Sequence, residues 1–150
     1  MNRIRQLFAI LIAAAAACCG MAQAQLVSEQ EAAESRAAPE RFTAKAIPAP
    51  DAPRIRVVAP NVSNPVASPT QIQVQFQPTS PALIRPDTFR VLYGSFRIDI
   101  TDRITASSKV TAQGIDVAEA KLPKGSHKLF IEIQDSAGRT GQSPLQFVVE

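Results

Sequence analysis

Histidine, cysteine, methionine and tryptophan are scarce in this chain, and their scarcity excludes several kinds of chemistry. The 150 residues include one histidine, His127, two cysteines, two methionines and no tryptophan. A histidine-based zinc or copper site needs several such ligands, and a Cys–His nucleophile pair needs a cysteine beside a histidine base. One histidine cannot build the metal site, and both cysteines lie in the N-terminal leader described below, which leaves no cysteine for the pair. We therefore predict that the protein is not an enzyme and holds no cofactor.

Aromatic residues are also few, at 5% of the chain, and Tyr93 is the single tyrosine. Carboxylates for glycoside cleavage are present, but no aromatic platform exists on which a sugar ring could stack. A carbohydrate-binding module is therefore a less favoured alternative. The chain also has no glycine-rich phosphate-binding loop. The core must rest mainly on valine, isoleucine, leucine and a handful of phenylalanines.

Aspartates do not cluster in a pattern that identifies a metal site. Asp99 and Asp102, with Asp116 or Asp135, could offer oxygen ligands to calcium, but their spacing is not diagnostic. We expect Asp99 to be a solvated strand residue, and Asp102 and Asp135 to form turns. No metal is predicted.

Residues 1–24 have the pattern of a secretory signal peptide. Two arginines precede an apolar run, and Ala22-Gln23-Ala24 has the small-x-small pattern of a cleavage site. The mature chain is then expected to begin at Gln25 and to be periplasmic or secreted. Removing the two arginines of the leader leaves 14 basic against 13 acidic residues, so no nucleic-acid partner is expected. Both methionines leave with the leader, which argues against a methionine-rich copper carrier.

Both cysteines, Cys18 and Cys19, also lie inside this leader, so the mature chain has no disulfide. An alternative is that Ala15-Ala16-Ala17-Cys18 acts as the lipobox of a bacterial lipoprotein, although it lacks the usual leucine. Cys18 would then be lipidated and would become the first mature residue. Contact with a membrane is expected only in that case.

Residues 25–53 are predicted to be a disordered linker rich in alanine, glutamate and proline. Such a segment buries too little apolar surface to offset its ordering entropy, and Pro48, Pro50 and Pro53 interrupt any helix. The alternative is a short amphipathic helix over Glu29–Ala38.

Residues 54–150 read as a succession of short strands separated by turns. Apolar and polar residues alternate with the two-residue period of half-buried strands. About seven strands are expected, at 55–58, 71–77, 89–93, 96–101, 109–111, 115–117 and, after a turn at 122–125, in a final hairpin formed by 128–134 and 145–149. This pattern predicts an all-β antiparallel sandwich, because there is no room for the helices that parallel strands need.

Three stretches carry a family resemblance: Ser68-Pro69 ahead of Ile72-x-Val74-x-Phe76-x-Pro78, then Leu122-Pro123-x-Gly125-x-His127-x-Leu129, and Ile133-x-Asp135-x-x-Gly138-Arg139. Over residues 54–150 the chain resembles the exported bacterial immunoglobulin-like domains. In those domains the second stretch opens the penultimate strand and an Asp-x-x-Gly-Asn turn leads into the last, so Arg139 is a departure. The resemblance implies an Ig-like sandwich without catalytic residues. It also places His127 at a corner aromatic position, so we expect a structural side chain bonded to a nearby loop.

The Ig-like order makes the strands at 89–93, 128–134 and 145–149 neighbours in one sheet. Leu92, Phe130 and Val148 would then form an apolar row on the outer face of this sheet, bordered by Arg90 and Lys128. An apolar patch with a polar border is typical of a partner-binding surface. The alternatives are that exposed apolar residues are ordinary here, or that the linker covers them.

These observations favour a non-catalytic exported Ig-like module, which either binds another envelope or secreted protein or is a structural component of the bacterial envelope. A carbohydrate-binding module and a lipid-anchored surface lipoprotein of the same fold are the alternatives.

Overall fold

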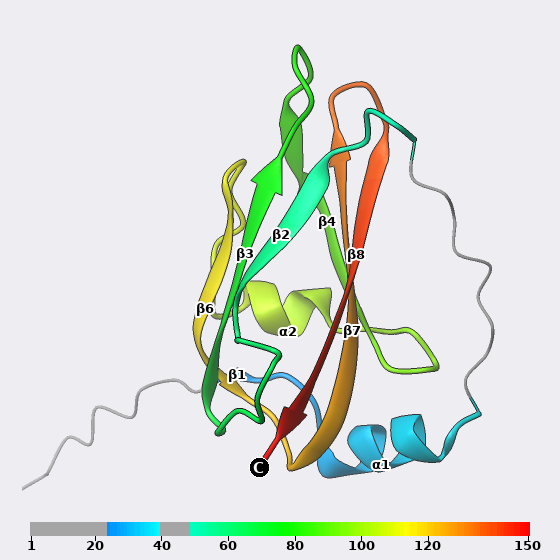
Figure 1. The fold of residues 1–150 in the computed structure, drawn as a ribbon, viewed down its shortest axis with the longest axis vertical. Helices are drawn as coiled ribbons and strands as arrows, with labels where there is room; N and C mark the ends of the chain where they lie inside the picture. The colour runs from blue at the N-terminus through cyan, green and yellow to red at the C-terminus, as the bar shows by residue number, and fades with distance from the viewer. Residues whose placement is uncertain (1–23, 40–48) are drawn as a thin grey trace, which may run out of the picture.

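The computed structural model describes residues 24–39 and 49–150, which form a sandwich of two four-stranded sheets (Figure 1). Sheet A contains, in spatial order, β1 (Ala24–Gln25), β6 (Gly114–Lys121), β3 (Thr70–Gln77) and β2 (Arg54–Ala59); sheet B contains β5 (Ile98–Asp99), β4 (Ile84–Tyr93), β7 (Gly125–Asp135) and β8 (Thr140–Val149). Neighbouring strands are antiparallel except β1 and β6, which run parallel. The predicted all-β sandwich is confirmed.

The inward faces of both sheets meet in one hydrophobic core. The inward-facing apolar residues of β4, β7 and β8 are all buried: Phe89, Val91, Tyr93, Leu129, Ile131, Ile133, Leu145, Phe147 and Val149. From sheet A, β3 contributes Ile72, Val74 and Phe76. The predicted adjacency of β4, β7 and β8 is likewise confirmed.

The structure corrects the linker expected over residues 25–53. Leu26 and Val27, directly after β1, are 0% and 1% exposed and belong to the core. The segment continues into helix α1 (Glu29–Ala37), which agrees with the alternative of a short helix. The average composition of the segment is polar, but these two adjacent apolar side chains bury enough surface to anchor it to the domain. Residues 40–48 lie outside the described part of the chain, while Ala52 and Pro53 are again buried.

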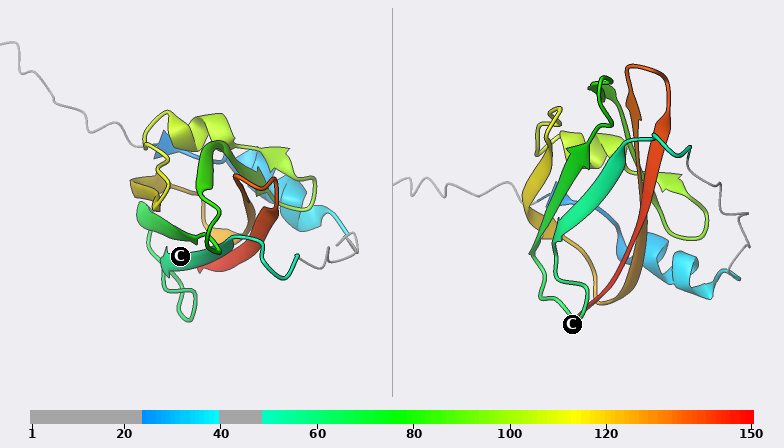
Figure 2. Two further views of the ribbon diagram at one scale, coloured as in Figure 1. Left: turned by 90° about the horizontal axis from the view of Figure 1, so that it is seen from above. Right: turned by 45° about the horizontal axis from the view of Figure 1, so that its top comes forward.

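Helix α1 is held at both of its ends. At its start, the Ser28 hydroxyl accepts a hydrogen bond from the Glu31 backbone N–H, and the Glu31 carboxylate accepts one from the Ser28 N–H, which together form a capping box. At its end, an Arg36 guanidinium N–H donates to the Lys124 carbonyl at 3.3 Å. Figures 1 and 2 show α1 at the end of the sandwich where the chain terminates, close to β7.

The fourth predicted strand, over 96–101, is mostly wrong. Phe96 lies in the turn between β4 and β5 and is 52% exposed, and only Ile98–Asp99 form a strand. Ile100 caps the short helix α2 (Thr101–Thr105), which buries Ile104 instead of continuing the strand. The candidate strand at 109–111 has no regular secondary structure.

Candidate functional site

The predicted apolar row is only partly assembled on the outer face of sheet B. The strand register places Leu92 directly opposite Phe130, and Phe130 directly opposite Pro144. Val148 pairs with Ser126 instead, so it lies further along β8 and is not in this row, although it is 44% exposed. We therefore define the Phe130 row as Leu92, Phe130 and Pro144. Sequence reasoning assigned Val148 to it because alternation gives the face of a residue but not its register.

Two cations lie against the Phe130 ring. The Arg97 guanidinium carbon is 4.4 Å from the ring centroid, and the Lys128 Nζ is 5.4 Å from it. Arg97 also approaches Glu132, with Nη1 4.0 Å from Oε1. Its backbone has a positive φ of 50°, an uncommon conformation for a residue with a Cβ. The turn before β5 thus brings an arginine onto the middle of sheet B, which no sequence pattern indicated.

A polar row borders the Phe130 row on one side. The register aligns Arg90 with Glu132 and Glu132 with Gln142, whose amide N–H donates to Glu132 Oε1 at 2.9 Å. On the other side Lys128 is aligned with Gln146. The predicted border residues Arg90 and Lys128 therefore do flank Leu92 and Phe130. Both apolar side chains remain partly exposed.

His127 is buried, at 1% exposed, and both ring nitrogens have partners. Nε2 lies 2.7 Å from the Pro123 carbonyl, which can only accept, so Nε2 carries the proton. Nδ1 then accepts from the Tyr93 hydroxyl at 2.9 Å. Burial lowers the pKa of His127 more than the Pro123 bond raises it, so the neutral ring is favoured. The expected structural role, bonded to a nearby loop, is confirmed.

Asp135 has its carboxylate enclosed in the β7–β8 turn. Its oxygens accept from the backbone N–H groups of Ala137 and Arg139, both at 3.0 Å, and from Arg139 Nε at 2.8 Å. Burial by itself would raise the pKa of Asp135, but these hydrogen bonds outweigh it and the pKa lies below its usual value. Arg139 thus serves the turn, and the predicted turn-forming role of Asp135 is confirmed.

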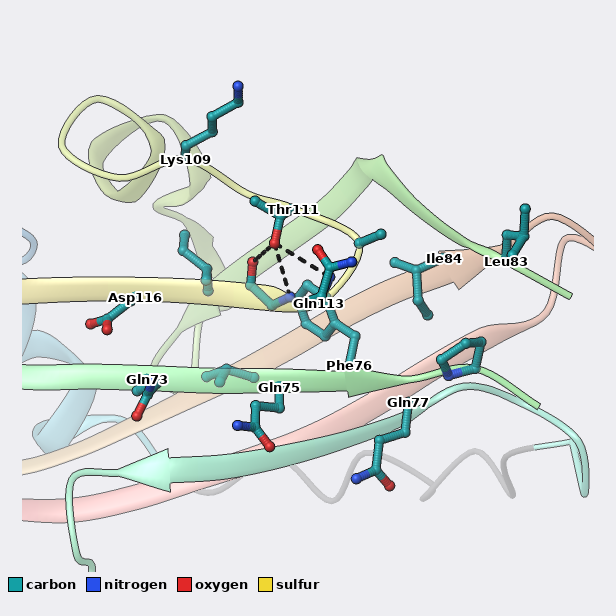
Figure 3. A pocket seen from close by; sticks show the side chains of 15 residues that line it. Gln73, Gln75, Phe76, Gln77, Leu83, Ile84, Lys109, Thr111, Gln113 and Asp116 are labelled. Atoms are coloured by element: carbon teal, nitrogen blue, oxygen red, sulfur yellow. Dashed lines mark hydrogen bonds between the residues drawn. The ribbon is translucent and has the colours of Figure 1, made fainter. Parts of the chain in front are cut away.

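Open grooves lie on the surface of the sandwich. One of them, of about 730 Å³, lies where β3 and β6 face the start of β4, and Figure 3 shows Phe76 and Ile84 inside it beneath Lys109 and Thr111. A smaller groove of about 360 Å³ separates β2 from β8 and includes Val62. In the described ranges, no three His, Cys, Asp or Glu side chains gather as metal ligands would.

The leader and its Cys18 precede the described residues, so signal-peptide cleavage and lipidation stay predictions. From Ala24 onward, apart from the gap at 40–48, no helix has the length and apolar character needed to span a bilayer.

The strand order defines the class of this protein. With β2, β3 and β6 in one sheet and β4, β7 and β8 in the other, it is a β-sandwich with the strand arrangement of an immunoglobulin-type fold. No family model matches the chain, and no curated protein matches it. Among solved structures it is similar to CopC from Methylosinus trichosporium OB3b, at 14% identity and a TM-score of 0.43, over 64% of this chain and 93% of that one. This similarity is too weak to transfer any property, and the family assignment stays a prediction.

Proposed function

We propose that this protein is a non-catalytic, exported Ig-like module that binds another envelope or secreted protein through the Phe130 row. The observation that carries the proposal is the position of Phe130, in the middle of sheet B between Leu92 and Pro144. Apolar and aromatic side chains at the centre of a patch, surrounded by polar ones, form the typical anatomy of a protein interface.

The cations on Phe130 strengthen this proposal. Arginine and aromatic residues are the types most enriched among those that dominate binding energy. Arg97 lies over the Phe130 ring and so combines a cation and an aromatic side chain at one place on the outer face of sheet B. A partner that covers this pair would remove the ring from water while keeping the guanidinium bonded to Glu132 or to an acidic group of its own.

The export part of the proposal rests on the leader, with the periplasm or the outside of the cell as the destination. The sequence alternative of a lipid anchor at Cys18 uses the same fold and the same binding surface. It differs only in holding the module at a membrane.

The substitution Phe130→Asp tests the binding surface. We expect the association to weaken on the order of tenfold or more, because a charge replaces the apolar centre of the interface. The fold is expected to persist, because Phe130 is partly exposed and the new carboxylate faces Arg97 and Lys128. Partners crosslinked to the intact protein in its native envelope identify the target, and titration of the purified target then measures affinity.

The matched control is Gln134→Asp, which adds the same charge on the same strand outside the Phe130 row. It should leave affinity unchanged. Unchanged affinity in Phe130→Asp, or a thermal transition lost in that variant alone, would contradict the proposed surface.

A further inference from the structure

The outer face of sheet A carries a regular series of amide side chains. Gln71, Gln73, Gln75 and Gln77 alternate along β3 with the buried apolar residues of that strand. Figure 3 shows Gln73, Gln75 and Gln77 projecting from the same side of β3, away from Phe76. With a rise of about 3.4 Å per residue, successive amides recur about every 7 Å along the strand.

Two arginines stand beside these amides. The register pairs Arg54 with Gln77 and Arg56 with Gln75, and directly opposite side chains have Cβ atoms about 5 Å apart. Both arginines are exposed. The outer surface of sheet A therefore carries two adjacent pairs, each made of one amide and one guanidinium. We call these two pairs, together with Gln73, the glutamine-arginine face.

A glycine lies next to the middle of this face on the neighbouring strand β6. Gly114 of β6 lies opposite Gln75, on the side away from Arg56. A Cβ at Gly114 would lie 2.0 Å from the Val74 carbonyl oxygen, so the close approach of β6 to β3 excludes any larger residue. Gly114 therefore lets β6 pair closely with β3 behind the Gln75 side chain.

The polar groups of this face have no partners among the residues that the structure describes. Of the four glutamines on β3, only Gln71 is engaged, through hydrogen bonds of 2.9 and 3.1 Å from its amide to Asp116. The side chains of Gln73, Gln75 and Gln77 make no hydrogen bond there, and Arg54 and Arg56 make no ion pair. Their donors and acceptors are available to a ligand.

We propose that the glutamine-arginine face binds an acidic polysaccharide through ionic and amide hydrogen bonds, which do not require the aromatic stacking platform that this chain lacks. Each amide offers a donor and an acceptor side by side, which match neighbouring sugar hydroxyls, and each guanidinium can grip a carboxylate with two parallel hydrogen bonds. The series of amides suits a ligand that is itself a linear repeat. Asp116 is the acidic group aligned with this face, and Gln71 already occupies its carboxylate.

A protein partner fits this face less well. Protein interfaces depend on large apolar or aromatic side chains at their centre, and the glutamine-arginine face has none. Its large exposed apolar neighbour is Val58, on the edge strand β2. The two opposite faces of the sandwich thus differ in chemistry, and this inference does not depend on the function of the Phe130 row.

Native electrophoresis of the mature protein through gels that contain polygalacturonate tests the proposal. We expect concentration-dependent retardation that neutral dextran does not cause. Gln73→Ala combined with Gln75→Ala should weaken binding to polygalacturonate, measured from the retardation, at least tenfold. Arg56→Gln should also weaken it, because the planar charged guanidinium is replaced by a planar but neutral amide. Gln146→Ala, an exposed amide on sheet B, is the matched control and should leave it unchanged.

Each remaining outcome overturns the proposal. Absence of retardation by polygalacturonate, equal retardation by dextran, or equal loss in Gln146→Ala would each contradict it. Equal retardation by poly-L-glutamate would show that simple charge attraction is sufficient and that the amides recognise no sugar. Thermal melts of each variant confirm that a loss of binding does not reflect a loss of fold. Phe130→Asp should bind polygalacturonate as well as the unchanged protein does, which separates this site from the protein-binding surface.

Discussion

At the scale of single residues, His127 shows how one buried polar side chain fixes a corner of the fold. It connects β7 to the Pro123 loop and to Tyr93 of β4 through two hydrogen bonds, without access to water. The positive charge of Arg36 in α1 also lowers the pKa of His127, so burial and this charge both disfavour the protonated ring. A proton added at Nδ1 would also require the Tyr93 hydroxyl to find a new acceptor.

This geometry predicts a stability that declines with acidification below pH 6.5. The pKa of His127 is lowered in the folded state, so between the folded and unfolded pKa values the unfolded chain binds more protons. The free energy of unfolding therefore falls as the pH drops, by at most about 1.4 kcal/mol per pH unit. Urea denaturation at pH 7.5, 6.5, 5.5 and 5.0 measures this slope.

His127→Gln isolates the effect, since the chain contains no other histidine. We expect the variant to be less stable at pH 7.5 but to have nearly constant stability between pH 6.5 and 5.0. Equal pH slopes in the two proteins would show that another group is responsible.

At the scale of elements, α1 is a helix that packing and capping hold in place. It has nine residues and buries only the Ala32 side chain, so it would be marginal in isolation. Glu31 accepts from Ser28 and also from Arg103 of α2, with two N–H···O contacts of 2.8 Å. The Arg103 hydrogen bonds, followed by the Ser28 backbone bond, lower the pKa of Glu31 to about 2. The ionised Glu31 therefore contributes to the stability of the fold above its ordinary pKa of 4.5, and this stabilisation is lost as the pH falls toward 2.

Ser28→Ala should detach the start of α1. We expect the free energy of unfolding to fall by about 1 kcal/mol, because the Glu31 N–H loses its cap. Compared with the unchanged protein, amide hydrogen exchange should be faster in α1 of the variant, while exchange in β7 should change less. Gln30→Ala removes only an exposed bond to Glu34 and serves as control. Equal effects of the two substitutions would mean that the capping box does not hold the helix.

The β4–β5 turn shows why an element can depart from its pattern. Residues 96–101 alternate as a strand should, but Gly94 and Arg97 adopt positive φ angles of 68° and 50° and turn the chain early. Ile100 and Ile104 then fill the open side of the sandwich from α2. Burial of two isoleucines between the sheets outweighs the preference for a longer edge strand.

At the scale of the whole molecule, the segment that follows the predicted cleavage site, from Gln25 to Ala37, belongs to the domain. β1 extends sheet A beside β6, and Leu26 and Val27 close the core behind it. A lipid at Cys18 would therefore hold the sandwich close to the bilayer, because extended chain spans at most about 3.5 Å per residue and few residues separate Cys18 from β1.

Leu26→Ala tests this role of the N-terminal segment. We expect it to lower the global free energy of unfolding by about 2–5 kcal/mol, as for other fully buried leucines. Urea denaturation followed by the fluorescence of Tyr93 measures the change. Val62→Ala, at a residue 51% exposed, should change it by no more than about 0.5 kcal/mol. A loss for Leu26→Ala as small as that for Val62→Ala would mean that the segment only rests on the domain.

Much of the fold was predictable from the sequence. The two-residue alternation in β3, β7 and β8 determined which side chains enter the core, because a strand with one buried face must present its apolar residues to that face. The Asp135 turn and the turn before Gly125 were also recognisable from residue type. A signal for α1 was present in Ser28 and Glu31, whose spacing is that of a capping box.

Only the tertiary structure decided how these elements meet. Strand register aligned Phe130 with Leu92 and Pro144, left Val148 out of the row, and set Arg54 and Arg56 beside the glutamines of β3. The tertiary structure also showed that Leu26 and Val27 are core residues, although the composition around them is typical of a linker. The sequence by itself determined the alternation within each strand, because sterics along one chain impose it. The pairing between strands depends on contacts among residues far apart in the chain, which local pattern does not encode.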